Sequence, residues 1–265
     1  MPKEIINKIR HAEGGYFPLF RLLPNLVTLT SLCIALTSIR YSLAGDFVHA
    51  SIFLLVAGFM DGVDGRLARF LNSSSDFGAQ LDSLVDFVNF GVTPGFIIYS
   101  WINYQGGVPM LDWAMVLFFA ICGAIRLARF NVDLASEKKN PILDKYFFKG
   151  IPAPVGAAMA MLPMVLFHEF GDGFYSNPLV VILYTSFLAV MMASRLPTIS
   201  IKKIPVRNEQ AYLTLLILGS IIIGLIVQTW ITLAVIGIVY AFSIPVTILA
   251  YKKIEREEKL KNPSL

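Results

Sequence analysis

The sequence is short of charged residues and of cysteine, and it lacks any long polar segment. Only 15% of its 265 residues are charged, whereas a typical soluble domain has about 25%. Its two cysteines give no disulfide framework and no zinc-binding spacing, and both lie in apolar stretches where small buried residues are ordinary. The first 24 residues contain no continuous apolar run followed by a small-residue cleavage site, so we expect no cleaved signal peptide. These absences leave no room for a second, soluble domain.

Hydrophobic residues make up 56% of the chain, and the mean hydropathy is +0.67. A helix needs about 20 mostly apolar residues to cross a bilayer. Eight stretches qualify, near 25–44, 47–70, 76–103, 112–133, 151–169, 178–195, 210–229 and 231–251. The sequence therefore predicts an all-α integral membrane protein with about eight transmembrane helices. We expect a juxtamembrane amphipathic segment at 1–24, a transmembrane catalytic domain at 25–251 and a cytoplasmic tail at 252–265.

Lysine and arginine are distributed unevenly along these spans. With the N-terminus placed in the cytoplasm, 21 of the 22 fall in cytoplasmic segments, and Arg40 alone lies toward the outside. The positive-inside rule predicts this distribution for an even number of spans. We therefore expect a multi-pass protein of the cell membrane with both termini on the cytoplasmic side. The net charge of +4 then reflects topology and anionic lipid, and indicates no nucleic-acid partner.

Four carboxylates interrupt the second and third spans: Asp61, Asp64, Asp82 and Asp86. Each would cost about 2.5–3.5 kcal/mol near the bilayer centre, so they require compensation. The spacings of three and four place each pair on one helix face, and a short turn at 71–75 folds the two helices antiparallel. Four facing carboxylates predict a divalent metal site, and oxygen ligands favour Mg²⁺ or Mn²⁺.

Small and cationic residues surround the acids, and each allows two interpretations. Gly65 and Gly78 could permit close helix packing or the approach of a bulky ligand to the backbone. Arg69 could pair with a phosphate or simply flank a cytoplasmic helix end. Ser75 could cap a helix or contact the ligand.

Residues 61–86 follow the pattern Asp61-x-x-Asp64-Gly65-x-x-Ala68-Arg69, eight residues, then Gly78-x-x-x-Asp82-x-x-x-Asp86. This string resembles the signature of the CDP-alcohol phosphatidyltransferase family and is complete at all eight positions. The resemblance implies a core of six spans, to which the last two spans are an addition. It also implies a polar cavity that opens to the cytoplasm, two divalent ions and a homodimer.

The same resemblance implies roles for individual residues. Asp61 and Asp82 would bridge the two ions, Asp64 would complete the first site, and Asp86 would complete the second and act as the catalytic base. The residues implied to contact CDP-diacylglycerol are Asn25, Thr28, Gly65, Arg69, Ser75 and Gly78.

The segments 89–94, 126–131 and 148–154 resemble the bacterial and archaeal membrane-type phosphatidylserine synthases. This indicates L-serine as the acceptor, with phosphatidylserine and CMP as products. The serine carboxylate would need a cation, for which Arg126, Arg129 and Lys149 are candidates, although both arginines could merely set topology. Asn89 and Thr93 stand where small residues are expected. The part of the chain beyond about residue 160 carries no further motif.

Two other functions remain open at this stage. The same transfer could use another alcohol, such as glycerol phosphate, inositol phosphate or ethanolamine, of which the phosphorylated acceptors would require more basic residues around the cavity. A cation transporter would also use intramembrane acids, but it would show inverted repeats and acids deeper along its path.

Overall fold

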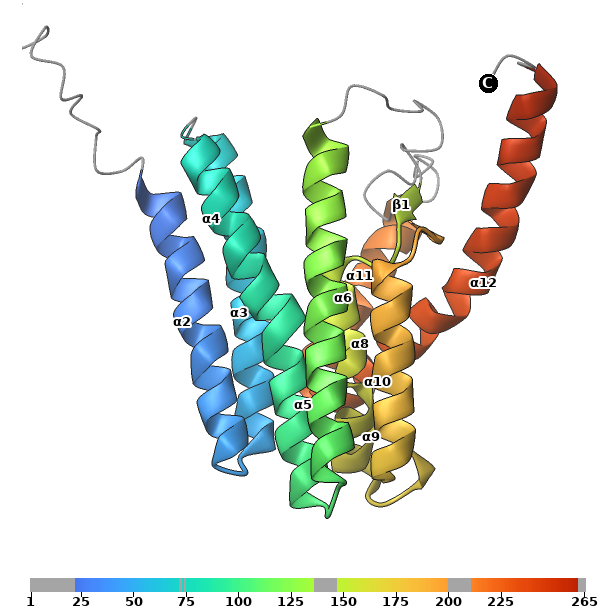
Figure 1. Ribbon diagram of the computed structural model, residues 1–265. Coiled ribbons are helices and arrows are strands. Elements are labelled where there is room, and N and C mark those ends of the chain that lie inside the picture. Colours follow the sequence, from blue (N-terminus) through green and yellow to red (C-terminus); the bar gives the residue numbers. More distant parts are fainter. Residues whose placement is uncertain (1–21, 72, 74, 136–146, 200–210, 262–265) are drawn as a thin grey trace, which may run out of the picture.

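The computed structural model describes residues 22–71, 73, 75–135, 147–199 and 211–261, most of which are helical (Figure 1). In chain order the elements are α2 (Leu23–Leu43), α3 (Phe47–Phe70), α4 (Asp76–Asp86), the π-helix η2 (Phe87–Val92), α5 (Thr93–Tyr104), α6 (Pro109–Ala135), β1 (Phe147–Lys149), α8 (Ala153–Ala160), α9 (Leu162–Phe170), the 3₁₀ turn η3 (Phe174–Ser176), α10 (Pro178–Ala193), β2 (Pro197–Ile199), α11 (Ala211–Val227) and α12 (Thr229–Lys261).

The predicted membrane fold is confirmed in its class. Six helical segments are long and apolar enough to span a bilayer, with α4–η2–α5 and α8–α9 each counted as one segment. Two of the eight predicted spans, α10 and α11, are apolar helices of fewer than 18 residues. Many large apolar side chains on the helix surfaces are exposed, as expected where lipid rather than water covers the protein.

The predicted domain limits are only partly covered by the described residues. The predicted amphipathic segment at 1–24 lies almost entirely outside them. At the other end, α12 runs through position 251 without interruption, so the predicted start of the tail is no break in the helix. In Figure 1 the last turn of α12 lies on the same side as the first turn of α2, as an even number of crossings requires.

Helices α2 and α3 form a tightly packed hairpin because small residues line their contact. Ala35, Ala50 and Ala57 are fully buried there. Two serine hydroxyls of α2 donate to backbone carbonyls of α3, from Ser31 to Ala57 at 3.0 Å and from Ser38 to Ala50 at 2.5 Å. Hydrogen bonds between close-packed small residues are typical of helix association in membranes.

The third predicted span contains a wider, π-helical turn, η2, just before Pro94. Proline has no N–H for the helical ladder and crowds the preceding turn. Within that wider turn, both the N–H and the hydroxyl of Thr93 donate to the carbonyl of Val88. Gly91 in this turn lies against Gly123 of α6, where a Cβ on Gly123 would come within 2.9 Å of the Gly91 Cα. The turn is thereby held between α6 and the α2–α3 hairpin.

The apolar core lies among α5, α6, α8, α9 and α10. One cluster joins Phe90 and Phe119 to residues of α8 and α10, and a second surrounds Trp101 with residues of α3, α5, α6 and α9. The short antiparallel pair β1–β2 closes one end of this core, with Phe148 opposite Thr198. Gly150 follows β1 with φ +76°, and a Cβ there would lie 2.6 Å from the Ser194 carbonyl oxygen. Ala50 and Leu54 of α3 belong to the second cluster, so the core supports from one side a helix that carries two of the aspartates.

Candidate active site

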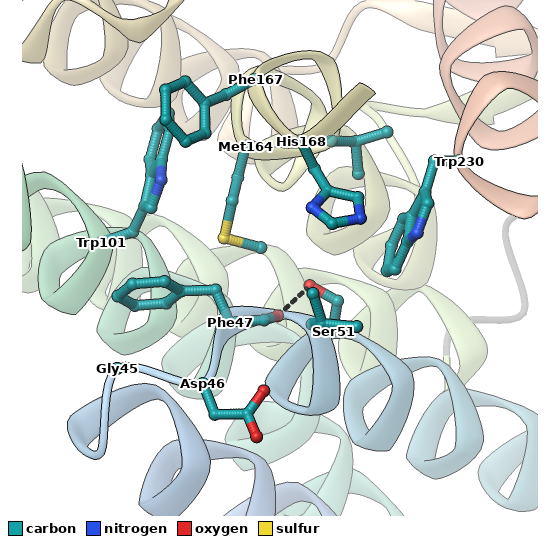
Figure 2. Close-up of a pocket in the computed structure, with 11 residues that line it drawn as sticks. Gly45, Asp46, Phe47, Ser51, Trp101, Met164, Phe167, His168 and Trp230 are labelled. Carbon is teal, nitrogen blue, oxygen red and sulfur yellow. Dashed lines mark hydrogen bonds between the residues drawn. The ribbon is translucent and has the colours of Figure 1, made fainter. Parts of the chain in front are cut away.

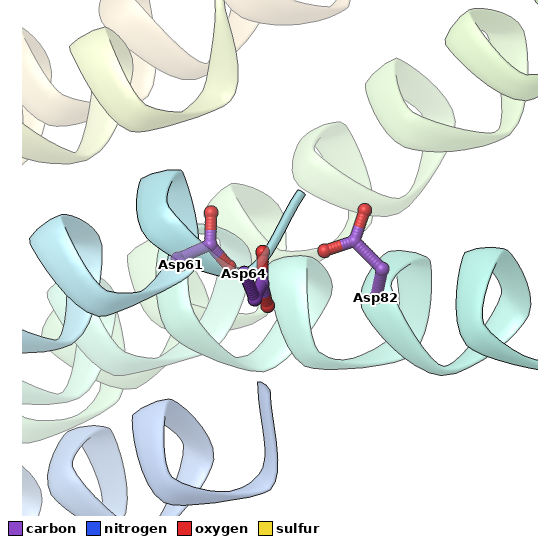
Figure 3. A group of neighbouring side chains, drawn as sticks. All are labelled: Asp61, Asp64 and Asp82. Atoms are coloured by element: carbon purple, nitrogen blue, oxygen red, sulfur yellow. The ribbon is translucent and has the colours of Figure 1, made fainter. Parts of the chain in front are cut away.

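The four aspartates converge where α3 and α4 run side by side. Asp61, Asp64 and Asp82 each offer a carboxylate oxygen, and these oxygens lie within 4.8 Å of one another. Figure 3 shows Asp61 and Asp64 on α3 beside Asp82 on the neighbouring helix. Asp86 stands one turn beyond Asp82, and its carboxyl group is close enough to that of Asp61 to interact with it. The arrangement brings together the acids that the helical spacing predicts on facing sides.

The carboxylates differ in how firmly the protein holds them. Asp64 is buried, and it accepts hydrogen bonds of 2.5 Å from the Thr28 hydroxyl and from the Gly65 N–H. Asp61 is half-buried, and its Oδ1 has no hydrogen-bond partner among the described residues. A buried carboxylate oxygen without a donor is costly unless a cation meets it. Clustered oxygen ligands with one buried oxygen unpaired fit a hard divalent ion such as Mg²⁺ or Mn²⁺.

A polar cavity of about 170 Å³ lies against these acids. Its walls come from the first turns of α2, the last turns of α3 and the start of α4. They include Asp64 and Asp82 together with all six residues predicted to contact CDP-diacylglycerol: Asn25, Thr28, Gly65, Arg69, Ser75 and Gly78. Pro24, Ala68, Ser73 and Ala79 complete the lining. Residues spread over more than 50 positions of sequence therefore share one cavity.

Local structure explains two of these positions. Ser75 is the N-cap of α4, and its hydroxyl accepts the Gly78 N–H at 3.0 Å, so the capping interpretation is confirmed. Gly78 packs against Asn25, because a Cβ on Gly78 would lie 3.0 Å from the Asn25 Oδ1. Close packing of α4 on α2 is thus one reason for glycine here, and it brings Asn25 into the cavity wall.

Thr28 has a structural role that its sequence position does not reveal. It is buried on α2, and its hydroxyl reaches the Asp64 carboxylate on α3, 36 residues away in sequence. It was expected to contact the nucleotide, and it also fixes one of the carboxylates.

The three cations predicted to bind the serine carboxylate lie outside the lining of this cavity. Arg126 is buried on α6, donates from Nε to the Ile151 carbonyl at 3.0 Å, and is close enough to Asp86 for an electrostatic interaction. Arg129 is exposed and donates to the Ala193 carbonyl. Lys149 forms an ion pair of 3.3 Å with Asp133. All three brace the region around β1, and Arg126 alone is both buried and near an aspartate of the cluster.

Sequence reasoning missed Asn89 as a member of the site. Asn89 is fully buried in η2, and its amide interacts with the Asp61 carboxyl group. The available signal was its spacing, since it continues the helix face of Asp82 and Asp86 by three residues.

A second cavity, of about 190 Å³, lies at the opposite end of the bundle and differs in chemistry. Figure 2 shows Trp101 and Phe167 on one side of it, His168 and Trp230 on the other, and Met164 between them. Asp46, its acidic lining residue, accepts the N–H of His49 and pairs with the His49 ring at 2.7 Å. The described residues around this cavity form no cluster of acids, so we place the reaction at the aspartates.

Comparison with known proteins agrees with this assignment. The sequence profile of the CDP-alcohol phosphatidyltransferase family matches residues 21–196. A Mycobacterium tuberculosis protein named CDP-diacylglycerol–serine O-phosphatidyltransferase is 32% identical over 225 residues, which cover 85% of this chain and 77% of that protein. Proteins of the same name from Helicobacter pylori and Bacillus subtilis are 34% and 31% identical, over 77% and 71% of this chain and 82% and 96% of their own lengths. The chain belongs to the CDP-alcohol phosphatidyltransferase family.

Proposed function

We propose that this protein transfers the phosphatidyl group of CDP-diacylglycerol to the hydroxyl group of L-serine, giving phosphatidylserine and CMP. The observation that carries the proposal is the meeting of the aspartate cluster with one polar cavity lined by all six expected nucleotide contacts. The names of the relatives favour serine over the other acceptors.

The four aspartates would hold two divalent ions: Asp61 and Asp82 would be ligands of both, Asp64 would belong to the first site and Asp86 to the second. The support is their clustering and the unpaired, buried Asp61 Oδ1. When bound, Mg²⁺ or Mn²⁺ would neutralise the diphosphate and stabilise the departing CMP.

The side chains of the chain itself bind the substrates and move the proton. Arg69 lies at the cavity wall, where a guanidinium group can hold a phosphate through two hydrogen bonds. The serine hydroxyl oxygen attacks the phosphorus that carries diacylglycerol, and the bond from that phosphorus to the oxygen of CMP breaks. The electron pair leaves with CMP, and the hydroxyl proton passes to Asp86. General-base catalysis of this kind contributes about 10²–10⁴ in rate.

Arg126 is our candidate for binding the serine carboxylate. Its support is its burial on α6 together with its electrostatic interaction with Asp86, which would draw the amino acid toward the proposed base. Arg129 and Lys149 are weaker candidates, because they are exposed and already bound to the Ala193 carbonyl and to Asp133.

We place the protein in the cell membrane as a homodimer, with the aspartate cavity and both termini on the cytoplasmic side. The support for the orientation is the asymmetry of lysine and arginine, 21 of 22 of which fall on one side. A reporter fused to each terminus tests the orientation, and the mass of the purified protein in lipid nanodiscs tests the dimer.

The decisive experiment is an acceptor panel. Purified protein is given CDP-diacylglycerol, Mn²⁺ or Mg²⁺, and one of serine, ethanolamine, glycerol phosphate or inositol phosphate, and CMP release and lipid product are measured. We expect serine-dependent CMP release that excess EDTA abolishes. A preference for another alcohol would overturn the serine assignment, and full turnover in EDTA would overturn the metal assignment.

A further inference from the structure

Asn89 is an unusual residue for the position it occupies. It lies in the π-helical turn η2 and has no exposed surface. Its amide oxygen is buried without a hydrogen-bond partner among the described residues. A side chain selected only for packing at this place would be apolar, because a buried unpaired oxygen destabilises the fold.

The hydrogen bond of the amide nitrogen explains why an asparagine is buried at position 89. Nδ2 donates to the Ser31 hydroxyl of α2 at 2.6 Å, and Ser31 in turn donates to the Ala57 carbonyl of α3 at 3.0 Å. The Ser31 hydroxyl has one hydrogen, which it donates to the Ala57 carbonyl, so it can only accept from Asn89. The amide nitrogen of Asn89, and not its oxygen, therefore faces Ser31. The amide also lies close enough to the Asp61 carboxyl group to interact with it, and no other hydrogen bond from Nδ2 is present among the described residues.

The placement of Asn89 follows from the helix that carries it. Asp82 and Asp86 share one face of α4, and Asn89 follows three residues after Asp86 in the π-helical turn η2. The contact between Gly91 and Gly123 holds the same turn from the α6 side. Asn89 is thereby a fixed bridge from the α4–η2 helix to both α2 and α3, at the level of the aspartates.

We infer that Asn89 is a positioning residue, which holds the Asp61 carboxylate in the orientation that shares a divalent ion with Asp82. The inference rests on the proposed function, because Asp61 needs such an orientation only if it binds metal. Groups that orient metal ligands in this way typically change metal affinity by about 10- to 100-fold when removed.

The test measures Mn²⁺ binding to the purified full-length protein without lipid substrate, by titration calorimetry or by the EPR signal of free Mn²⁺. Asn89→Leu keeps the size of the side chain and removes its donor. We expect it to weaken Mn²⁺ binding about 10- to 100-fold, with no fall in the melting temperature measured in EDTA. In turnover, the Mn²⁺ concentration for half-maximal rate should rise while the KM for serine stays unchanged.

Thr93→Val is the matched control. Thr93 is equally buried four residues further along, and its hydroxyl bonds only to the Val88 carbonyl. It should bind Mn²⁺ as the unmodified protein does, and an equal loss in both variants would overturn the inference. Wild-type Mn²⁺ affinity in Asn89→Leu would overturn it too.

If Asn89→Leu does not fold, Ser31→Ala tests whether Asn89 positions Asp61 for metal binding. This smaller change removes the hydrogen-bond acceptor that anchors Asn89, and Mn²⁺ binding should weaken about 2- to 10-fold, as for one neutral hydrogen bond. Unchanged binding in Ser31→Ala would overturn the inference. An unmodified protein that binds no Mn²⁺ would instead overturn the two-metal proposal itself, so the two failures are distinguishable.

Discussion

Replacing Thr28 by valine tests whether the first helix takes part in the metal site. Thr28 is 4% exposed, and its hydroxyl lies 2.5 Å from Asp64 Oδ2 and 3.0 Å from the Pro24 carbonyl. A hydroxyl has one hydrogen, and Thr28 donates it to Asp64, because that contact is shorter and its acceptor is charged. A hydrogen bond to a charged group contributes about 1.5–3 kcal/mol, which corresponds to about 10- to 150-fold in affinity. Because Asp64 keeps the Gly65 N–H, we expect a loss near the lower end of that range.

The assay is CMP release as a function of Mn²⁺ concentration. Thr28→Val should raise the Mn²⁺ concentration for half-maximal rate about 10-fold, and Thr28→Ser should restore it. Thr30→Val is the control, because Thr30 lies on the same helix, is exposed and donates only to the Leu26 carbonyl. If Thr28→Val changes only the KM for CDP-diacylglycerol, the residue contacts the nucleotide directly and the argument through Asp64 fails.

Three further variants test the assigned roles. Asp82→Asn should abolish turnover while the protein stays folded in detergent, because the shared ligand of both ions is lost; an active Asp82→Asn enzyme would refute the metal assignment. Asp86→Asn should also lose turnover, measured as CMP release, yet keep more binding of CDP-diacylglycerol than Asp82→Asn does, and equal loss of binding would speak against the base role. Arg126→Ala should raise the KM for serine about 10- to 150-fold, as a charge-assisted hydrogen bond implies, and leave the KM for CDP-diacylglycerol nearly unchanged, with Arg129→Ala as the comparison. A normal serine KM in Arg126→Ala would leave that residue a structural role, through its contacts with Ile151 and Phe130.

The sequence predicts the membrane helices and the aspartate cluster well, because both depend on short-range spacing. Apolar run length sets where a span can lie, and spacings of three and four set which face an acid occupies. The same reasoning gives the turn between α3 and α4, and Ser75 is the cap that it suggests. The six residues predicted to contact the nucleotide follow from the family pattern, and they share one cavity in the structure.

The sequence does not predict contacts between segments that are far apart along the chain. The hydroxyl of Thr28 reaches Asp64 across 36 positions, and Arg129 reaches Ala193 across 64. Each of these side chains has several possible partners until the helices are packed. The fifth span likewise appears continuous by hydropathy, yet its helix is interrupted at Met161, two residues before Pro163.

The energetics of the four aspartates connect the fold to the proposed metals. Left uncompensated at membrane depth, four carboxylates would cost on the order of 10 kcal/mol, as much as the whole stability of a typical domain. Among the described residues, no lysine or arginine forms an ion pair with any of them; the ion pairs there are His49–Asp46 and Lys149–Asp133. Hydrogen bonds satisfy Asp64, but Asp61 keeps a buried oxygen without a donor. Since the described residues supply too little positive charge, the carboxylates are compensated by bound cations, by water or by protonation, and clustered carboxylate oxygens favour a divalent cation. The same deficit that makes uncompensated carboxylates costly would make the cluster bind metal tightly, next to the cavity where a diphosphate needs neutralising.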